Sequence, residues 1–185
     1  MRRQIVARWQ DWSGKGLEHV VLEIKDDVIT ASSIVLAMAD HRPFVVQYEL
    51  RCDCQWRLRE ARIMVPGEQR ALELRTDGTG HWTDGAGAAL PQLAGTIDID
   101  ISVTPLTNTL PIRRLAWAAD RAAELRMAYV LLPHLAVTAD PQRYTCLEPQ
   151  RRFRYESLDS DFTRDIEIDA DGLVVSYPGL FRRVL

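Results

Sequence analysis

The chain has 185 residues, of which 46% are hydrophobic, and this length suits one domain with a sizeable core. It has 23 Lys and Arg residues and 26 Asp and Glu residues, which gives a formal net charge of -3. This balance offers no electrostatic case for nucleic acid. We therefore expect a single domain over residues 1–185 and no nucleic-acid partner.

The N-terminal residues include two arginines but no apolar run long enough for a signal peptide. No later run is long enough to span a bilayer, so we expect a cytoplasmic protein without a membrane-spanning segment. Reduced thiols are expected for Cys52, Cys54 and Cys146, because Cys52 and Cys54 lie at the upper limit of disulfide reach. The histidines do not group with the cysteines as zinc ligands, so we expect no metal site and no cofactor.

Strand patterns dominate the first half of the chain. The Asp26-Asp27 pair separates two β-branched runs and predicts a hairpin, a second pair of strands ends at Pro66-Gly67, and Asp77-Gly78 turns a third run back toward Trp82. The expected strands cover residues 17–25, 28–36, 45–51 and 56–65, and another begins at Ala71.

Residues 95–115 hold two carboxylates and two arginines close together. Ile97, Ile99 and Ile101 alternate with Asp98, Asp100 and Ser102, which predicts a strand with one apolar and one polar face. The two aspartates then point the same way, with Cβ atoms about 6 to 7 Å apart. At this spacing they can share a ligand or raise each other's pKa; the alternative is an ordinary solvated face.

A helix is expected directly after this strand. Thr107 or Asn108 can cap its first amides, and Pro111 suits an early helical position. Residues 116–127 are rich in alanine and read as either helix or strand, while residues 129–132 and 135–138 read as strand. The predicted fold is mainly β, a large curved antiparallel sheet wrapped around a single α-helix that fills its concave side.

Several chemical motifs can be weighed on these elements. The Asp98-Ile99-Asp100 triplet resembles the metal-binding triplet of glycosyltransferases, but no Gly-rich phosphate loop accompanies it. Glu18 supplies a third acid, and Trp9 and Trp12 lie just before it, as aromatic rings do in sugar sites. The alternative is that the rings only cover one end of the sheet. No Ser/His/Asp or Cys/His arrangement stands out, so no catalytic residue is assigned.

Taken together, these motifs resemble the bacterial putative glycolipid-binding family, which began as a domain of unknown function. The resemblance covers nearly the whole chain. It is carried by Trp9 and Trp12, the run Gly16-Leu17-Glu18-His19, residues 98–115 with Thr-Asn-Thr-Leu-Pro-Ile-Arg-Arg-Leu, Gln142-Arg143-Tyr144-Thr145, and Tyr177-Pro178-Gly179-Leu180-Phe181.

The resemblance implies a many-stranded sheet around one helix, a tight homodimer, remote similarity to lipoprotein-localisation factors and an acidic pocket for a glycolipid. It also favours strand for much of residues 116–131. Because such carriers work outside the cytoplasm, the lack of a signal peptide argues against the same role for this protein.

Our candidate ligand-binding residues are Asp98, Asp100, Glu18, His19 and Arg113. The aspartates would accept from sugar hydroxyls with Glu18 and His19 nearby, and Arg113 would orient the acids or an anionic head group. The simpler alternative is that Arg113 and Arg114 only neutralise the acids and close the helix onto the sheet.

The leading functional hypothesis is a non-enzymatic, dimeric protein that binds a glycolipid or another amphipathic small molecule. An apolar groove would take the acyl chain, and the acidic pocket would take the head group. One alternative is a carbohydrate-active or hydrolytic enzyme using Asp98, Asp100 or Glu18, which requires a carboxyl with a raised pKa in a cleft. The other is a dimeric interaction module without a ligand.

Overall fold

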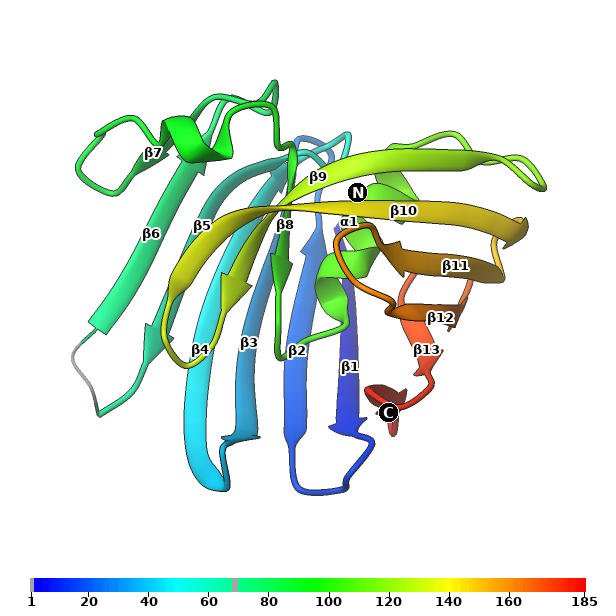
Figure 1. Ribbon diagram of the computed structural model, residues 1–185, viewed down its shortest axis with the longest axis horizontal. Coiled ribbons are helices and arrows are strands. Elements are labelled where there is room, and N and C mark those ends of the chain that lie inside the picture. Colours follow the sequence, from blue (N-terminus) through cyan, green and yellow to red (C-terminus); the bar gives the residue numbers. More distant parts are fainter. Residues whose placement is uncertain (1, 68–69) are drawn as a thin grey trace.

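Figure 1 shows the computed structural model, which describes residues 2–67 and 70–185. Within these residues, fourteen strands form one open, strongly curved sheet, and one short α-helix follows a 3-10 turn (Figure 1). The strands are β1 (Arg3–Asp11), β2 (Leu17–Ile24), β3 (Val28–Ala39), β4 (Arg42–Asp53), β5 (Leu58–Val65), β6 (Arg70–Thr76), β7 (Trp82–Asp84), β8 (Asp98–Ile101), β9 (Ala122–Leu131), β10 (Ala136–Glu148), β11 (Arg152–Ser157), β12 (Thr163–Ile168), β13 (Val174–Tyr177) and β14 (Phe181–Arg183). The 3-10 turns are Pro91–Leu93 and Leu106–Asn108, and the helix α1 is Thr109–Arg114.

Two meanders and one further edge strand, β8, make up the sheet. Strands β1 to β7 form the first and β9 to β14 the second, and the pairing of β1 with β14 joins them, so that strands from the two ends of the chain are neighbours. The predicted curved β-sheet around one helix is therefore confirmed. It is not wholly antiparallel, because β8 runs parallel to β9. Parallel neighbours need a long crossover, and the segment that holds α1 supplies it.

The expected hairpins are present, and the third and fourth strands of the first meander are longer than predicted. Strand β3 continues to Ala39 and β4 begins at Arg42. Asp40 and His41 form the turn between them with φ angles of 49° and 62°, the left-handed conformation of a two-residue hairpin. The sequence pattern missed this turn because it contains no glycine.

The ambiguous stretch at residues 116–127 is strand from Ala122 onward. Strand β9 pairs with β10 along ten consecutive residue pairs, from Ala122 with Thr145 to Leu131 with Ala136. This pairing outweighs the helix propensity of the alanines, because propensity is worth only tenths of a kcal/mol per residue (~0.5).

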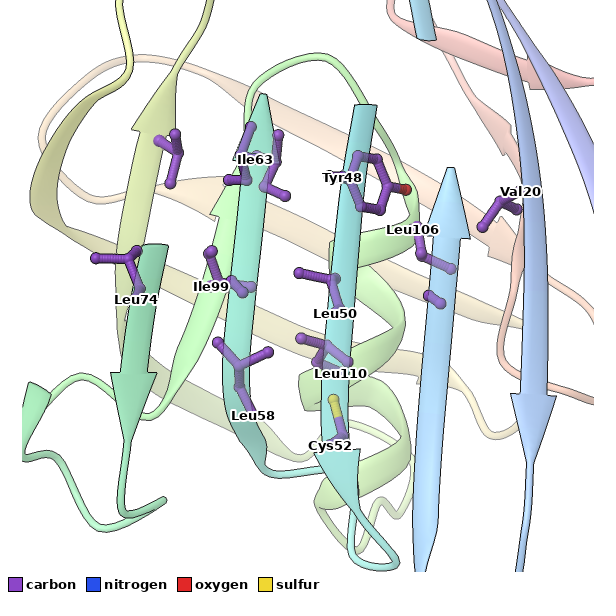
Figure 2. Packing of buried hydrophobic residues seen from close by; sticks show 14 of the residues in the cluster. Val20, Tyr48, Leu50, Cys52, Leu58, Ile63, Leu74, Ile99, Leu106 and Leu110 are labelled. Atoms are coloured by element: carbon purple, nitrogen blue, oxygen red, sulfur yellow. The ribbon is translucent and has the colours of Figure 1, made fainter. Parts of the chain in front are cut away.

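Residues 96–115, which we call the bridging segment, cover the concave face of the sheet. Every residue from 104 to 112 is buried. Leu106 and Leu110 pack in one apolar cluster beside Tyr48 and Leu50 of β4 (Figure 2), while Ile112 packs in a second cluster with residues of β10 to β13. The predicted role of the helix as the filler of the sheet is thus confirmed.

The predicted capping of the helix is wrong. Asn108 occupies the N-cap position, but its side chain makes no capping bond and instead donates from Nδ2 to the Tyr144 hydroxyl at 2.9 Å. The Thr107 hydroxyl donates to Asp100 Oδ1 at 3.2 Å. Because the preceding 3-10 turn runs directly into α1, both polar side chains are free to bind neighbouring strands.

We expect Leu110→Ala to lower the free energy of unfolding by about 2–5 kcal/mol, because it opens a cavity where the bridging segment meets the sheet. Leu110 is 3% exposed. The matched control is Leu131→Ala, in which the leucine is 42% exposed; its effect should stay within about 0.5 kcal/mol. Urea denaturation measures both, and equal losses would contradict the packing role of α1.

Candidate functional site

Asp98 forms a buried ion pair. Its carboxylate is 1% exposed and accepts from Arg114 Nε at 3.2 Å and Nη2 at 2.5 Å. Burial raises the pKa of Asp98, and the guanidinium of Arg114 acts in the opposite direction. This pair ties the end of α1 to β8, as the simpler alternative for the arginines predicts.

Asp100 lies one pleat further along β8 and has different partners. Thr107 donates to its Oδ1, and Gln142 Nε2 donates to its Oδ2 at 2.7 Å. The same nitrogen of Gln142 also lies 2.7 Å from Asp140 Oδ2 on β10, so one amide bridges two carboxylates. The pKa of Asp100 is raised to about 6, chiefly by burial and to a smaller extent by the charge of Asp140, while the hydrogen bonds from Gln142 and Thr107 act in the opposite direction.

Asp100 and Asp140 line a pocket of about 310 Å³, which we call the acidic pocket. Five aromatic rings share its walls with the acids, a combination suited to a sugar because rings stack on apolar sugar faces and carboxylates accept from hydroxyls. The lining residues are Asp100, Ile101, Ser102, Thr104, Asn108, Tyr129, Asp140, Tyr155, Ser157, Ser160, Phe162, Tyr177, Leu180 and Phe181.

Glu18 lies near this region in a buried hydrogen-bond network. Its Oε1 accepts from the hydroxyls of Tyr48 at 2.5 Å and Ser33 at 2.7 Å, while its Oε2 is buried without a partner. The Tyr48 hydroxyl lies 3.2 Å from Oγ1 of Thr104, which lines the acidic pocket. Burial raises the pKa of Glu18 to about 7, although the hydrogen bond from Tyr48 opposes the shift.

The structure does not bring the other candidates to the acidic pocket. His19 follows Glu18 on β2 and therefore faces the opposite side of the sheet, where its Nδ1 accepts from Arg8 Nε at 3.1 Å. Arg113 is exposed and lies over the ring of Trp56, 5.3 Å from its centroid, beside a different hollow. Asp98 is occupied by Arg114. Only Asp100 of the five candidates lines the acidic pocket.

A second hollow of about 280 Å³, the apolar groove, adjoins the acidic pocket. The two share Ser102, Leu180 and Phe181 as lining residues. Apolar side chains form most of the groove wall, with Asp11 and Glu18 as its carboxylates. Among the lining residues, Trp12 and Leu180 are large, apolar and exposed. Leu17, Leu36 and Met38 are exposed too, but strand alternation turns their side chains to the outer side of the sheet.

The sequence analysis did not identify Asp140 as the second acid of the acidic pocket, nor the aromatic residues that line it. Asp140 and Gln142 alternate with Pro141 at the middle of β10, and their role depends on β10 passing close to Asp100. Gln142 belongs to the Gln142-Arg143-Tyr144-Thr145 motif that carries the family resemblance, but the sequence alone assigned no chemical role to it. Tyr155 and Tyr177 come from other strands, so no local pattern connects them with Asp100.

The three cysteines, Cys52, Cys54 and Cys146, are free thiols, as predicted.

None of the helices in the described part of the chain is long and apolar enough to cross a membrane.

We predict that Glu18 makes stability fall as pH rises. In the unfolded chain its carboxyl ionises near pH 4.5, but in the folded chain it keeps its proton to about pH 7. Between these values the folded state binds more protons, so the free energy of unfolding falls by about 3 kcal/mol across the window and then levels off.

Urea denaturation from pH 4.5 to 8 of the parent chain and Glu18→Gln tests this effect, because other titrations cancel in the difference. The control is Glu23→Gln on the same strand, where hydrogen bonds from Arg2 and Lys25 lower the pKa of the carboxyl, so that it titrates mainly below this pH range and the difference should stay nearly constant within it. A difference for Glu18→Gln that stays constant with pH would refute the buried, protonated carboxyl.

Comparisons with known proteins agree with this fold. Residues 6–183 match the family described as "Putative glycolipid-binding". Among solved structures, the chain is similar to the crystal structure of a DUF1089 family protein from Pseudomonas aeruginosa, with 39% sequence identity, a TM-score of 0.81 and 92% of each chain covered. No curated protein matches the chain. The match over nearly its whole length shows that the chain belongs to the family described as putative glycolipid-binding.

Proposed function

We propose that the protein binds a glycolipid without chemically changing it, with the sugar in the acidic pocket and the acyl chain in the apolar groove. The observation that carries this proposal is that the two hollows adjoin, sharing Ser102, Leu180 and Phe181. An amphipathic ligand needs such a junction, because its polar and apolar parts are covalently joined. The family description supports the same class of ligand.

The composition of each hollow suits its part of the ligand. The acidic pocket combines carboxylates with the rings of Tyr129, Tyr155 and Tyr177, which can stack on a sugar and bind its hydroxyls. The apolar groove has exposed side chains, among them Trp12 and Leu180, whose contact with water an acyl chain would remove.

Of the five candidate binding residues, we propose Asp100 as a direct acceptor for the ligand, and we add Asp140. Glu18 would act indirectly, through Tyr48 and Thr104, by fixing the pocket wall. Asp98 has Arg114 as its partner, and His19 and Arg113 lie elsewhere, so we propose no direct ligand contact for these three residues.

The enzymatic alternative has a specific observation in its favour. Burial raises the pKa of the Glu18, Asp98 and Asp100 carboxyls, as a general acid requires. However, Glu18 is 2% exposed and Asp98 is ion-paired, which leaves Asp100 with Asp140 as the carboxyls that line the acidic pocket. Release of free sugar from a bound glycoside would favour the enzyme over the binding protein.

The binding proposal predicts that affinity for alkyl β-glucosides rises with chain length. Each methylene buried in the apolar groove contributes about 0.8 kcal/mol, which is about fourfold in affinity. Titration calorimetry with hexyl to decyl glucosides, below their micelle concentrations, measures the increase. Failure of every alkyl glucoside to bind would overturn the proposal.

Leu180→Asp should flatten this dependence on chain length, because it places a charge in the shared wall. The control is Val175→Asp on β13, since Val175 is 38% exposed against 36% for Leu180 and lines neither hollow. The control variant should keep the full increase of affinity with chain length.

We further propose that the protein is cytoplasmic and that it forms a homodimer; the family resemblance implies the homodimer. The outer side of the sheet carries the exposed side chains of Val6 and Ile34 beside the half-buried Val21. Light scattering should give twice the chain mass of 21.1 kDa, and Ile34→Lys should shift the population to the monomer. A monomeric parent chain would contradict the dimer.

A further inference from the structure

We propose that the acidic pocket is built for a head group that carries a protonated amine, such as an amino sugar. This inference rests on the proposed glycolipid function and names the class of its head group. It comes from the charges in the pocket, from a buried acceptor without a partner, and from the aromatic wall.

The first observation is unbalanced negative charge. Asp98 has Arg114 as its counterion, but neither Asp100 nor Asp140 forms an ion pair with Lys, Arg or His in the described part of the chain. Their shared partner, Gln142, is neutral. None of the Lys, Arg and His residues that the structure describes lines the acidic pocket, so its carboxylates repel a phosphate or sulfate head group and attract a cation.

The second observation is an excess of acceptors. Asn108 is 3% exposed and lines the pocket, and its Oδ1 has no hydrogen-bond partner. Gln142 Oε1 is also buried without a partner, but Gln142 does not line the pocket, so Asn108 Oδ1 is the unpaired acceptor that a ligand can reach. A buried acceptor is normally satisfied, and an ammonium group brings three donors and no acceptor.

The third observation is the continuous aromatic wall. The ring centroid of Tyr155 lies 5.9 Å from that of Phe162 and 6.1 Å from that of Tyr177, and Tyr177 lies 6.4 Å from Phe181. Ring faces attract cations as well as the C–H faces of sugars. An amino sugar uses both properties, whereas a neutral sugar uses only the second.

One cation already lies at this wall, and it does not neutralise the acids. The guanidinium of Arg164 lies 4.7 Å from the centroid of Phe162 and donates to the main-chain carbonyls of Thr163 and Pro178. It shows that the outer ring attracts a cation, and it leaves Asp100 and Asp140 available for a ligand.

The test compares octyl 2-amino-2-deoxy-β-glucopyranoside with octyl β-glucopyranoside and the 2-acetamido analogue, by titration calorimetry of the full chain below the micelle concentrations. The three probes differ only at one position of the sugar. We expect the amine to bind at least about tenfold more tightly than the other two. Equal affinities would overturn the amine preference but leave glycolipid binding intact, whereas no binding of any probe would overturn both.

Variants then locate the preference. Asp140→Asn and Asp100→Asn should each bring the ratio of amine to neutral affinity toward one. The control is Asp165→Asn, which removes a carboxylate that pairs with Arg154 outside the acidic pocket and should leave the ratio unchanged. Thermal melts identify any variant that fails to fold. Because each variant removes a different carboxylate of the pocket, one folded variant is enough to decide the test. If a folded Asp100→Asn or Asp140→Asn variant keeps the parent's ratio of amine to neutral affinity, these carboxylates do not cause the amine preference.

Discussion

The sheet, which has fourteen strands in the part of the chain that the structure describes, has a large apolar concave face that has to be covered, and residues 96–115 cover its centre. The segment enters where Gly80 and Gly95 pass so closely that a Cβ on Gly80 would lie 2.8 Å from the Gly95 Cα. It then forms β8, a 3-10 turn and α1 in succession. Because this cover is short, the concave side beyond it keeps two hollows, the acidic pocket and the apolar groove.

The same segment explains why carboxylates occur in the interior. A buried carboxylate needs a counterion, hydrogen bonds or a proton, and each acid near the segment has a different solution. Asp98 has Arg114, Glu18 has the hydroxyls of Tyr48 and Ser33 together with a raised pKa, and Asp100 shares an amide with Asp140. Of these three arrangements, only the amide shared by Asp100 and Asp140 leaves negatively charged carboxylates beside an open pocket.

Much of the fold could be predicted from the sequence because alternation is a local signal. The hairpin at Asp26-Asp27, the curved sheet and the filling helix all follow from patterns within a few residues. The turn at Asp40-His41 and the parallel pairing of β8 do not, since they depend on backbone conformation and on a distant strand. The alanine-rich stretch became strand because β10 was available as its partner.

The candidate site was less predictable, because its residues come together from distant parts of the chain and local patterns do not connect them. Asp98 and Asp100 look equivalent in the sequence, and only their partners in the fold distinguish them: Arg114 pairs with Asp98, whereas neutral side chains bind Asp100. Asp140 lies forty residues beyond Asp100, and the aromatic wall comes from β9, β11, β13, β14 and the loop before β12. Glu18 and His19 are adjacent in sequence, yet strand geometry places them on opposite faces of the sheet.

The central claim is that the part of the concave face left open by the bridging segment holds an amphipathic ligand in one orientation. A crystal structure of the full chain with octyl β-glucopyranoside tests it most directly. We predict the sugar ring beside Asp100 and Asp140 and the alkyl chain running past Leu180 toward Trp12. A glucoside bound on the outer face of the sheet, or one whose alkyl chain fills the acidic pocket, would contradict the claim.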